Sequence, residues 1–358
     1  MRAAPRLACA AACLLALPGL IAGCGDSGSD DPTTSAVVEA PSRPAPSKSE
    51  FPSPEGRSLR EVLKAGDGPA EAAVEPAAMV FYRGENRYPF GVLEHGHTPV
   101  PDAEVALYVA KAPQPKPGAK SKPGHKGQVA KAVSQALDEP AVGPFPASIE
   151  TLATKPAFRS RTTTADPESA PVVYSTQLDF PSNGEWRIAA LVKEDGEIRG
   201  KLLPAAVVGE FSNVPRAGQM APRIHTPTVA TVNGDTGQIT TRVPPDTQNQ
   251  IDYADALGKE PVMLLFATPR FCQSRVCGPV VDVAEQVKRE YGDEAAFIHM
   301  EIFKDQQPGK VRPQVRAFNL PSEPWLFAID RAGRVSSAIE GAVGVAGMTA
   351  AVKKAVAE

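Results

Sequence analysis

The sequence is poor in features that mark several large classes of protein. It has 38 lysines and arginines against 41 aspartates and glutamates, a formal net charge of −3. It therefore lacks the basic excess that nucleic-acid binding uses, and we expect no nucleic-acid partner. Aromatic residues are only 6% of the 358 residues, which indicates that part of the chain is not packed into a core. Only five cysteines occur, so each can be considered individually.

Long apolar runs are also scarce. The stretch 7–20 follows two basic residues, Arg2 and Arg6, and is shorter than a membrane-spanning helix needs. The sequence after this stretch, Ile-Ala-Gly-Cys at positions 21–24, resembles the lipobox of bacterial lipoproteins. This resemblance implies a signal peptide over residues 1–23, lipidation of Cys24, and a lipid anchor on the extracytoplasmic face of the cell membrane. The alternative is an ordinary signal peptide cleaved nearby, with Cys24 an incidental thiol.

The cysteines then divide into two groups. Cys9 and Cys13 would leave with the signal peptide, and Cys24 would carry the lipid. Cys272 and Cys277 would remain as thiols in the mature protein. In an oxidising extracytoplasmic space, such a pair is expected to form a disulfide or a redox couple.

Composition divides the rest of the chain into segments. Residues 24–75 are rich in Gly, Ser, Asp and Pro and are predicted to be a flexible linker, with a short helical turn over 58–64. Short apolar runs bounded by turn signals predict an all-β sandwich domain over 76–214. Its strands are predicted at 78–83, 104–109, 172–180, 184–192 and 205–211. The Pro-, Lys- and Gly-rich stretch 111–143 is predicted to be a disordered insertion.

The C-terminal part has a different pattern. Residues 215–250 are predicted to be a linker that adds edge strands at 228–232 and 238–243. Residues 251–358 alternate between helical and strand patterns. Helices are predicted at 251–257, 278–291, 310–318 and 345–356, and strands at 262–267, 295–302, 324–330 and 335–339.

The cysteine pair follows the most apolar of these strands. Residues 262–267 form a continuous apolar run, as in a strand covered on both faces, and Thr268 and Pro269 end it. Cys272 then precedes a helix, where free N–H groups and the helix dipole favour a thiolate. Arg270 and Arg275 add positive charge nearby. This arrangement is typical of a reactive cysteine.

The order of elements after residue 250 resembles the thioredoxin fold. The cysteines follow the first central strand, Pro324 opens the strand after the third helix, and a tight hairpin comes next at 329–334. The resemblance implies an α/β thioredoxin-like C-terminal domain, residues 251–358, beside the all-β sandwich. It also implies a cis Pro324 against the active cysteines and thiol–disulfide exchange with protein thiols or disulfides. No cofactor is expected. Cys272 would attack and Cys277 would resolve.

The spacing of the cysteines departs from thioredoxins. Four residues separate them where thioredoxins have two. On a regular helix they would lie about 140° apart around the axis. Their Cα atoms would then be farther apart than the roughly 7 Å that a disulfide allows. Cys272 must therefore lie outside the helix, or the first turn must unwind. One group of peroxiredoxins, the bacterioferritin-comigratory type, has this spacing. A peroxidase that uses the same two cysteines is therefore the alternative to thiol–disulfide exchange. Pro269 and Pro324 stand where that family has a threonine or serine and an arginine.

Other interpretations remain open. Sco-type copper chaperones also combine closely spaced cysteines with a distant histidine, but His299 is expected to be a partly buried strand residue. His95 and His97 beside Glu94 could bind a metal or simply form a polar hairpin loop. One histidine and two cysteines are an incomplete zinc set, so no metal is expected. Finally, Cys272 and Cys277 could form a permanent structural disulfide in a non-enzymatic binding protein.

Overall fold

The computed structural model describes residues 41–94, 98–113 and 134–358. The predicted signal peptide, Cys24, His95 and His97 lie outside these residues, as does most of the predicted insertion. Within the described part of the chain, no helix has the length and apolar character that crossing a membrane requires.

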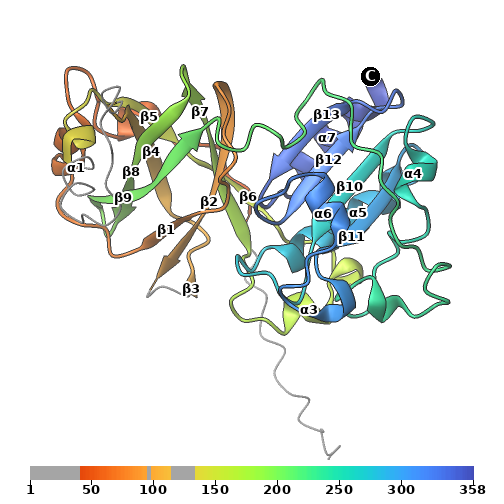
Figure 1. Cartoon of the computed structure of the whole chain (residues 1–358). Helices are drawn as coiled ribbons and strands as arrows, with labels where there is room; N and C mark the ends of the chain where they lie inside the picture. The colour runs from red at the N-terminus through yellow and green to blue at the C-terminus, as the bar shows by residue number, and fades with distance from the viewer. Residues whose placement is uncertain (1–40, 95–97, 114–133) are drawn as a thin grey trace, which may run out of the picture. The chain divides into compact units, whose positions relative to one another are not determined.

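The N-terminal part forms two antiparallel sheets (Figure 1). In the first, the strand order is β1-β2-β7-β6, and β3 also pairs with β2; in the second, the order is β5-β4-β8-β9. The strands of the first sheet are β1 (Ala73–Pro76), β2 (Gly84–Glu94), β3 (Thr98–Pro99), β6 (Ser148–Thr151) and β7 (Val172–Phe180). Those of the second are β4 (Glu104–Lys111), β5 (Val142–Pro146), β8 (Gly184–Glu194) and β9 (Glu197–Val208).

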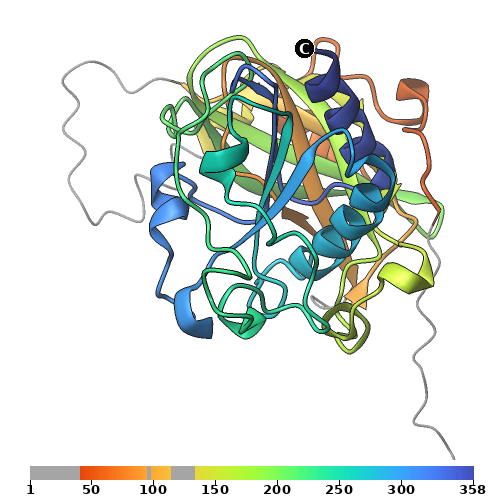
Figure 2. The ribbon, with the colours of Figure 1, turned by 90° about the vertical axis from the view of Figure 1, so that its right-hand side faces the viewer.

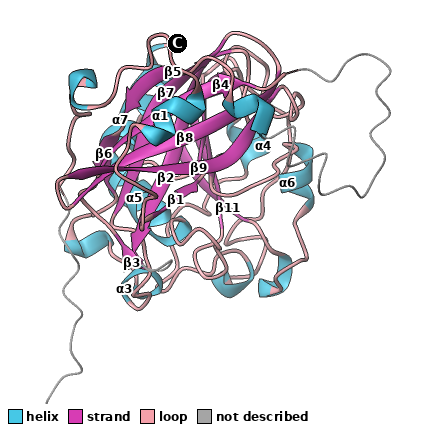
Figure 3. Cartoon of the chain, turned by 90° about the vertical axis from the view of Figure 1, so that its left-hand side faces the viewer, coloured by secondary structure: helices cyan, strands magenta, loops and turns pink. Residues whose placement is uncertain are grey.

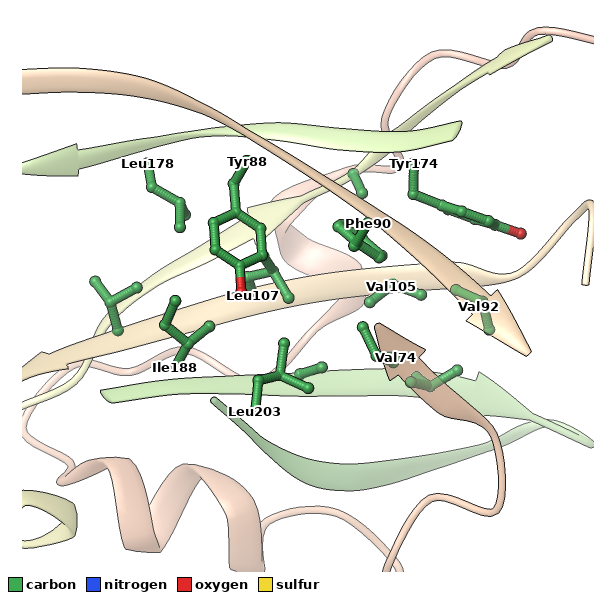
Figure 4. Packing of buried hydrophobic residues seen from close by; sticks show 14 of the residues in the cluster. Val74, Tyr88, Phe90, Val92, Val105, Leu107, Tyr174, Leu178, Ile188 and Leu203 are labelled. Atoms are coloured by element: carbon green, nitrogen blue, oxygen red, sulfur yellow. The ribbon is translucent and has the colours of Figure 1, made fainter. Parts of the chain in front are cut away.

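Buried side chains from both sheets share one hydrophobic core (Figure 4). Phe90 on β2 and Tyr174 on β7 stack with ring centroids 5.4 Å apart. Leu107 of β4 and Ile188 of β8 enter the same core from the second sheet. Two sheets that enclose a common core have the arrangement of a β-sandwich, because each sheet buries one apolar face against the other.

Several predictions in this part are wrong. The expected strand at 78–83 contains only an isolated bridge at Phe81, and the real strand β2 begins at Gly84. Pro89 and Gly91 interrupt the apolar pattern of β2, which hides it in the sequence. Strands β5 and β6 are likewise absent from the prediction. The interruption between β4 and β5 is shorter at both ends than the predicted insertion, since β4 continues to Lys111 and β5 begins at Val142.

Within the predicted flexible linker, the helical turn expected over 58–64 is confirmed, but the segment around it is not a free linker. Helix α1 (Leu59–Lys64) begins with a capping box in which Ser58 and Glu61 each bond to the other's backbone N–H. Leu59 and Val62 are fully buried in a core cluster shared with β4 and β8. Figure 3 shows α1 over the strands. Two well-placed apolar residues therefore fix a segment whose average composition is polar.

The C-terminal part contains a mixed sheet with the order β11-β10-β12-β13. Its strands are β10 (Val262–Ala267), β11 (Ala296–Glu301), β12 (Trp325–Ile329) and β13 (Val335–Glu340). β11 runs parallel to β10, and the other neighbours are antiparallel. The helices are α4 (Tyr253–Ala256), α5 (Cys277–Tyr291), α6 (Pro313–Ala317) and α7 (Val345–Ala357). The predicted order of elements is confirmed.

The helices α5 and α7 lie side by side (Figure 2). Their apolar residues share a core cluster with Met263 and Leu265 of β10, while Leu264 and Phe266 face a second cluster. All six residues of β10 are buried, because both faces of the sheet are covered.

Residues 215–250 are all described, and no strand lies among them, so the predicted edge strands are wrong. Their only regular element is a 3₁₀ helix, Thr236–Gln238. Several of their polar side chains are buried and bond to other parts of the chain. The buried polar residues are Thr226, Thr228, Thr240, Thr241, Arg242, Asp246, Gln248 and Asn249. The segment is therefore packed against its surroundings and is not a free linker.

Candidate functional site

The two cysteines lie at the end of β10 and the start of α5. After β10, Thr268 is buried, and a loop that includes Pro269 leads to the helix. Cys272 lies in this loop and Cys277 is the first residue of α5. Cys272 therefore lies outside the regular helix, as the spacing requires.

Cys272 and Cys277 form a disulfide with a Cα–Cα distance of 5.9 Å, within the usual range. The backbone N–H of Cys277 donates to Sγ of Cys272 at 3.3 Å, and Ser274 Oγ lies 3.3 Å from the same sulfur. Cys272 is 6% exposed and Cys277 is 0% exposed. Cys272 is therefore the more accessible of the two cysteines. Its sulfur has two polar neighbours that can stabilise a thiolate.

Buried groups hold the start of the cysteine loop in place. The backbone N–H of Arg270 donates to Thr241 Oγ1 at 3.2 Å. Thr241 in turn donates through its N–H and hydroxyl to the carboxylate of Glu301, at 3.0 and 2.7 Å. Phe271 is half-buried and packs edge-on against Phe303. Residues far apart in sequence thus set the position of the loop.

A buried ion pair supports the first half of α5. Asp282 accepts a bond from Nε of Arg242 at 2.8 Å, and both side chains are almost completely buried. The backbone N–H of Ser160 donates to the same carboxylate at 3.0 Å. Burial raises the pKa of Asp282, and the Ser160 bond and the Arg242 charge offset this only in part. Asp282 therefore joins three separate segments of the chain.

The segment between β6 and β7 covers this end of α5. It contains helix α3 (Arg161–Thr164). A Cβ atom on Gly278 would lie 2.9 Å from Thr163 Oγ1, so glycine permits the close approach. On the loop side, Arg275 forms ion pairs with Asp166 at 3.3 Å and Glu168 at 3.2 Å. This segment helps to limit exposure of the cysteines.

A second buried ion pair lies beside the end of β10. His299 on β11 places Nδ1 2.8 Å from Asp246 Oδ2 and Nε2 3.2 Å from the carbonyl oxygen of Ala267. Thr240 donates to Asp246 at 2.6 Å. Burial alone would lower the pKa of His299, but the Asp246 carboxylate outweighs burial and raises it to about 9. His299⁺ thus binds the last residue of the strand that leads to the cysteine loop.

Sequence patterns do not reveal this network. The prediction of a partly buried His299 is wrong, because the residue is only 1% exposed. Its partner is 53 residues away in a segment predicted to be a linker, so no local spacing indicates the pair. Among the described residues, no group of three or more His, Cys, Asp or Glu side chains could hold a metal ion.

Pro324 lies near the same edge of the sheet. The Glu323–Pro324 peptide bond is cis, as predicted, and its contact with the cysteines stays a prediction. Trp325 pairs with Phe266 in the sheet register, so Pro324 lies by the end of β10 from which the cysteine loop departs. Burial, with a contribution from the charge of Glu301, raises the pKa of Glu323.

The sequence predicts a substrate surface near Arg270, Phe271 and Trp325, with core positions for the two aromatic residues as the alternative, and this surface is only partly present. Trp325 is buried and stacks on Phe327 at 5.5 Å, so it is a core residue and cannot contact a partner. Arg270 is exposed, and Phe271 is half-buried beside it. The accessible part of the predicted surface is therefore Arg270 and one side of Phe271.

No protein-family model matches the chain. No curated protein matches it either. Among solved structures, one match is a thiol:disulfide interchange protein, a thioredoxin family protein from Chlorobium tepidum TLS. It is 21% identical over 38% of this chain and 96% of its own, with a TM-score of 0.28. A superposition this loose carries no inference about the fold or function of the present chain.

Proposed function

We propose that this chain is a thiol–disulfide oxidoreductase that uses Cys272 and Cys277. The observation that carries the proposal is the asymmetry of the disulfide. Cys272 is the less deeply buried cysteine, it lies in a loop before a helix, and its sulfur accepts the backbone N–H of Cys277 at 3.3 Å. A sulfur in that position is suited to carry negative charge during exchange.

The exchange proceeds in two steps. In the reduced protein, the Cys272 thiolate attacks one sulfur of a substrate disulfide, forming a mixed disulfide while the other substrate sulfur leaves as a thiolate that takes a proton from water. The Cys277 thiolate then attacks Cys272 and releases the second substrate thiol. The protein is oxidised by two electrons and the substrate is reduced. The oxidised protein performs the reverse reaction with a substrate dithiol.

The partners of this reaction are protein thiols or disulfides. Arg270 and Phe271 are the accessible residues beside Cys272, and Glu323, which precedes cis Pro324, would present its backbone to an incoming peptide at the same edge. The N-terminal lipobox motif supports anchoring through lipidated Cys24 at the extracytoplasmic face of the membrane. In that compartment the cysteine pair would meet disulfide-containing proteins.

A permanent structural disulfide is the second candidate. It is favoured by the burial of Cys277 and by the segment that carries Thr163 over the start of α5. A disulfide that only staples the loop needs no access for a second thiol. The two candidates differ in how easily the bond is reduced.

The test is the reduction potential of the pair. Full-length protein with Cys9, Cys13 and Cys24 replaced by serine is equilibrated in thiol/disulfide buffers, alkylated, and analysed by mass spectrometry. An oxidoreductase should have a potential between about −120 and −270 mV, whereas a structural disulfide should lie below about −300 mV. A potential in the lower range, or resistance to mild reductant in the folded protein, would favour the staple.

A further inference from the structure

The cysteine loop forms one wall of a cavity of about 700 Å³. Pro269 and Arg270, which precede Cys272, line it together with Arg275, which comes after it. The opposite side is formed by Arg161 and neighbouring residues of the segment between β6 and β7. The cavity therefore lies between that segment and the loop that contains the more exposed cysteine.

The charges around this cavity are not balanced. Arg275 is neutralised by Asp166 and Glu168, and Arg242 in the lining is neutralised by buried Asp282. Within the described residues, Arg161 and Arg270 form no ion pair, and both are exposed. Arg161 and Arg270 thus line the cavity without a carboxylate partner of their own, since Asp166, which also lines it, pairs with Arg275.

From this arrangement we infer that the cavity binds carboxylate groups of the thiol or disulfide that reacts at Cys272. Guanidinium groups recognise carboxylates by paired hydrogen bonds, which give orientation as well as attraction. Neither cysteine lines the cavity, so an anionic substrate held by Arg161 and Arg270 would reach Cys272 past Arg270, which precedes it by two residues. The inference rests on the proposed function and specifies its substrate class as acidic.

The lining supports this choice of ligand. Thr241 and Gln306 also line the cavity, but their side-chain donors bond to Glu301 and to the carbonyl oxygen of Gly237, which leaves the two arginines as the donors for a ligand. The backbone of Arg270 is held by Thr241, so the loop is fixed without use of the Arg270 guanidinium. The guanidinium lies over the ring of Phe271, with Cζ 5.6 Å from the centroid, and its charge remains available for a ligand. Its removal should leave the backbone of the loop in place.

The experiment compares two disulfides of similar size. Reduced full-length protein, with Cys9, Cys13 and Cys24 replaced by serine, is mixed with anionic 3,3′-dithiodipropionate or neutral 2-hydroxyethyl disulfide. Its oxidation is followed by quenched alkylation and mass spectrometry. The ratio of the two rates cancels general changes in cysteine reactivity. We expect Arg161→Gln and Arg270→Gln each to lower this ratio by about three- to fivefold.

Arg289→Gln is the matched control. Arg289 is exposed near the C-terminal end of α5, and about 18 Å of helix separates it from Cys277. This variant makes the same charge change away from the cavity and should leave the ratio unchanged. Thermal unfolding of each variant checks that the fold is intact. An unchanged ratio in the Arg161→Gln, Arg270→Gln double variant would overturn the inference.

A non-reactive ligand separates this inference from the proposed function. The thioether 3,3′-thiodipropionate carries the same carboxylates but no disulfide, and its binding is measured by calorimetry. If the protein reacts with neither disulfide yet binds the thioether through the two arginines, the cavity assignment stands and the redox function fails. If exchange occurs but the thioether does not bind, the cavity assignment fails. A glutamate-flanked peptide disulfide and its glutamine counterpart distinguish an acidic protein segment from a small acidic thiol as the source of the carboxylates.

Discussion

The buried pair of His299 and Asp246 should make the stability of this protein depend on pH in the mildly alkaline range. The perturbation is His299→Gln, which removes the titrating group and the cationic partner of Asp246. The two side chains are 2.8 Å apart, and neither is exposed to solvent. A buried carboxylate that loses its partner typically costs about 3–5 kcal/mol of stability.

The pH dependence arises from the two states of His299. Its pKa is raised from 6.5 to about 9 in the folded protein, chiefly because Asp246 outweighs the effect of burial. Between these values the folded state retains a proton that the unfolded state has released. The stabilisation is complete below about pH 6.5 and is lost as the pH rises to about 9. A shift of this size corresponds to about 3 kcal/mol.

Urea unfolding between pH 6 and pH 9.5 measures this effect. The stability of the wild-type protein relative to His299→Gln should fall by about 3 kcal/mol over that range. His225→Gln provides the control, because His225 is 84% exposed and pairs with Asp252 at the surface. It should change stability by no more than about 1 kcal/mol. A pH-independent difference between wild type and His299→Gln would refute the assignment of a charged, buried histidine.

Three further results are expected. In single Cys→Ser variants, Cys272 should alkylate about tenfold faster than Cys277, because it is more exposed and its sulfur accepts an N–H bond; equal rates would count against the assigned roles. Leu59→Ala should lower the free energy of unfolding by about 2–5 kcal/mol, because Leu59 is fully buried, whereas a flexible linker would give no change in urea unfolding. Asp282→Asn should destabilise the protein by about 3–5 kcal/mol, because it leaves Arg242 buried without its counter-charge. A loss of stability below about 1 kcal/mol in calorimetry would argue against a critical ion pair.

Local sequence patterns determined much of the C-terminal part. The apolar run 262–267, the helical spacing after Gly278 and the turn before Val335 each predict their element correctly, since short-range periodicity reflects which faces are covered. The position of Cys272 before the helix and the bond to Cys277 also agree with spacing and chain geometry.

The surroundings of the cysteines were decided only by tertiary structure. Asp246 forms an ion pair with His299, and Arg242 forms one with Asp282. Arg161 and Arg270 line the same cavity. In each of these three pairs the two residues are far apart in the sequence. No periodicity reports such contacts, because the polar side chains involved are indistinguishable in sequence from those of a solvated linker. Burial decides their role, since removal from water makes a charged group depend on its one partner.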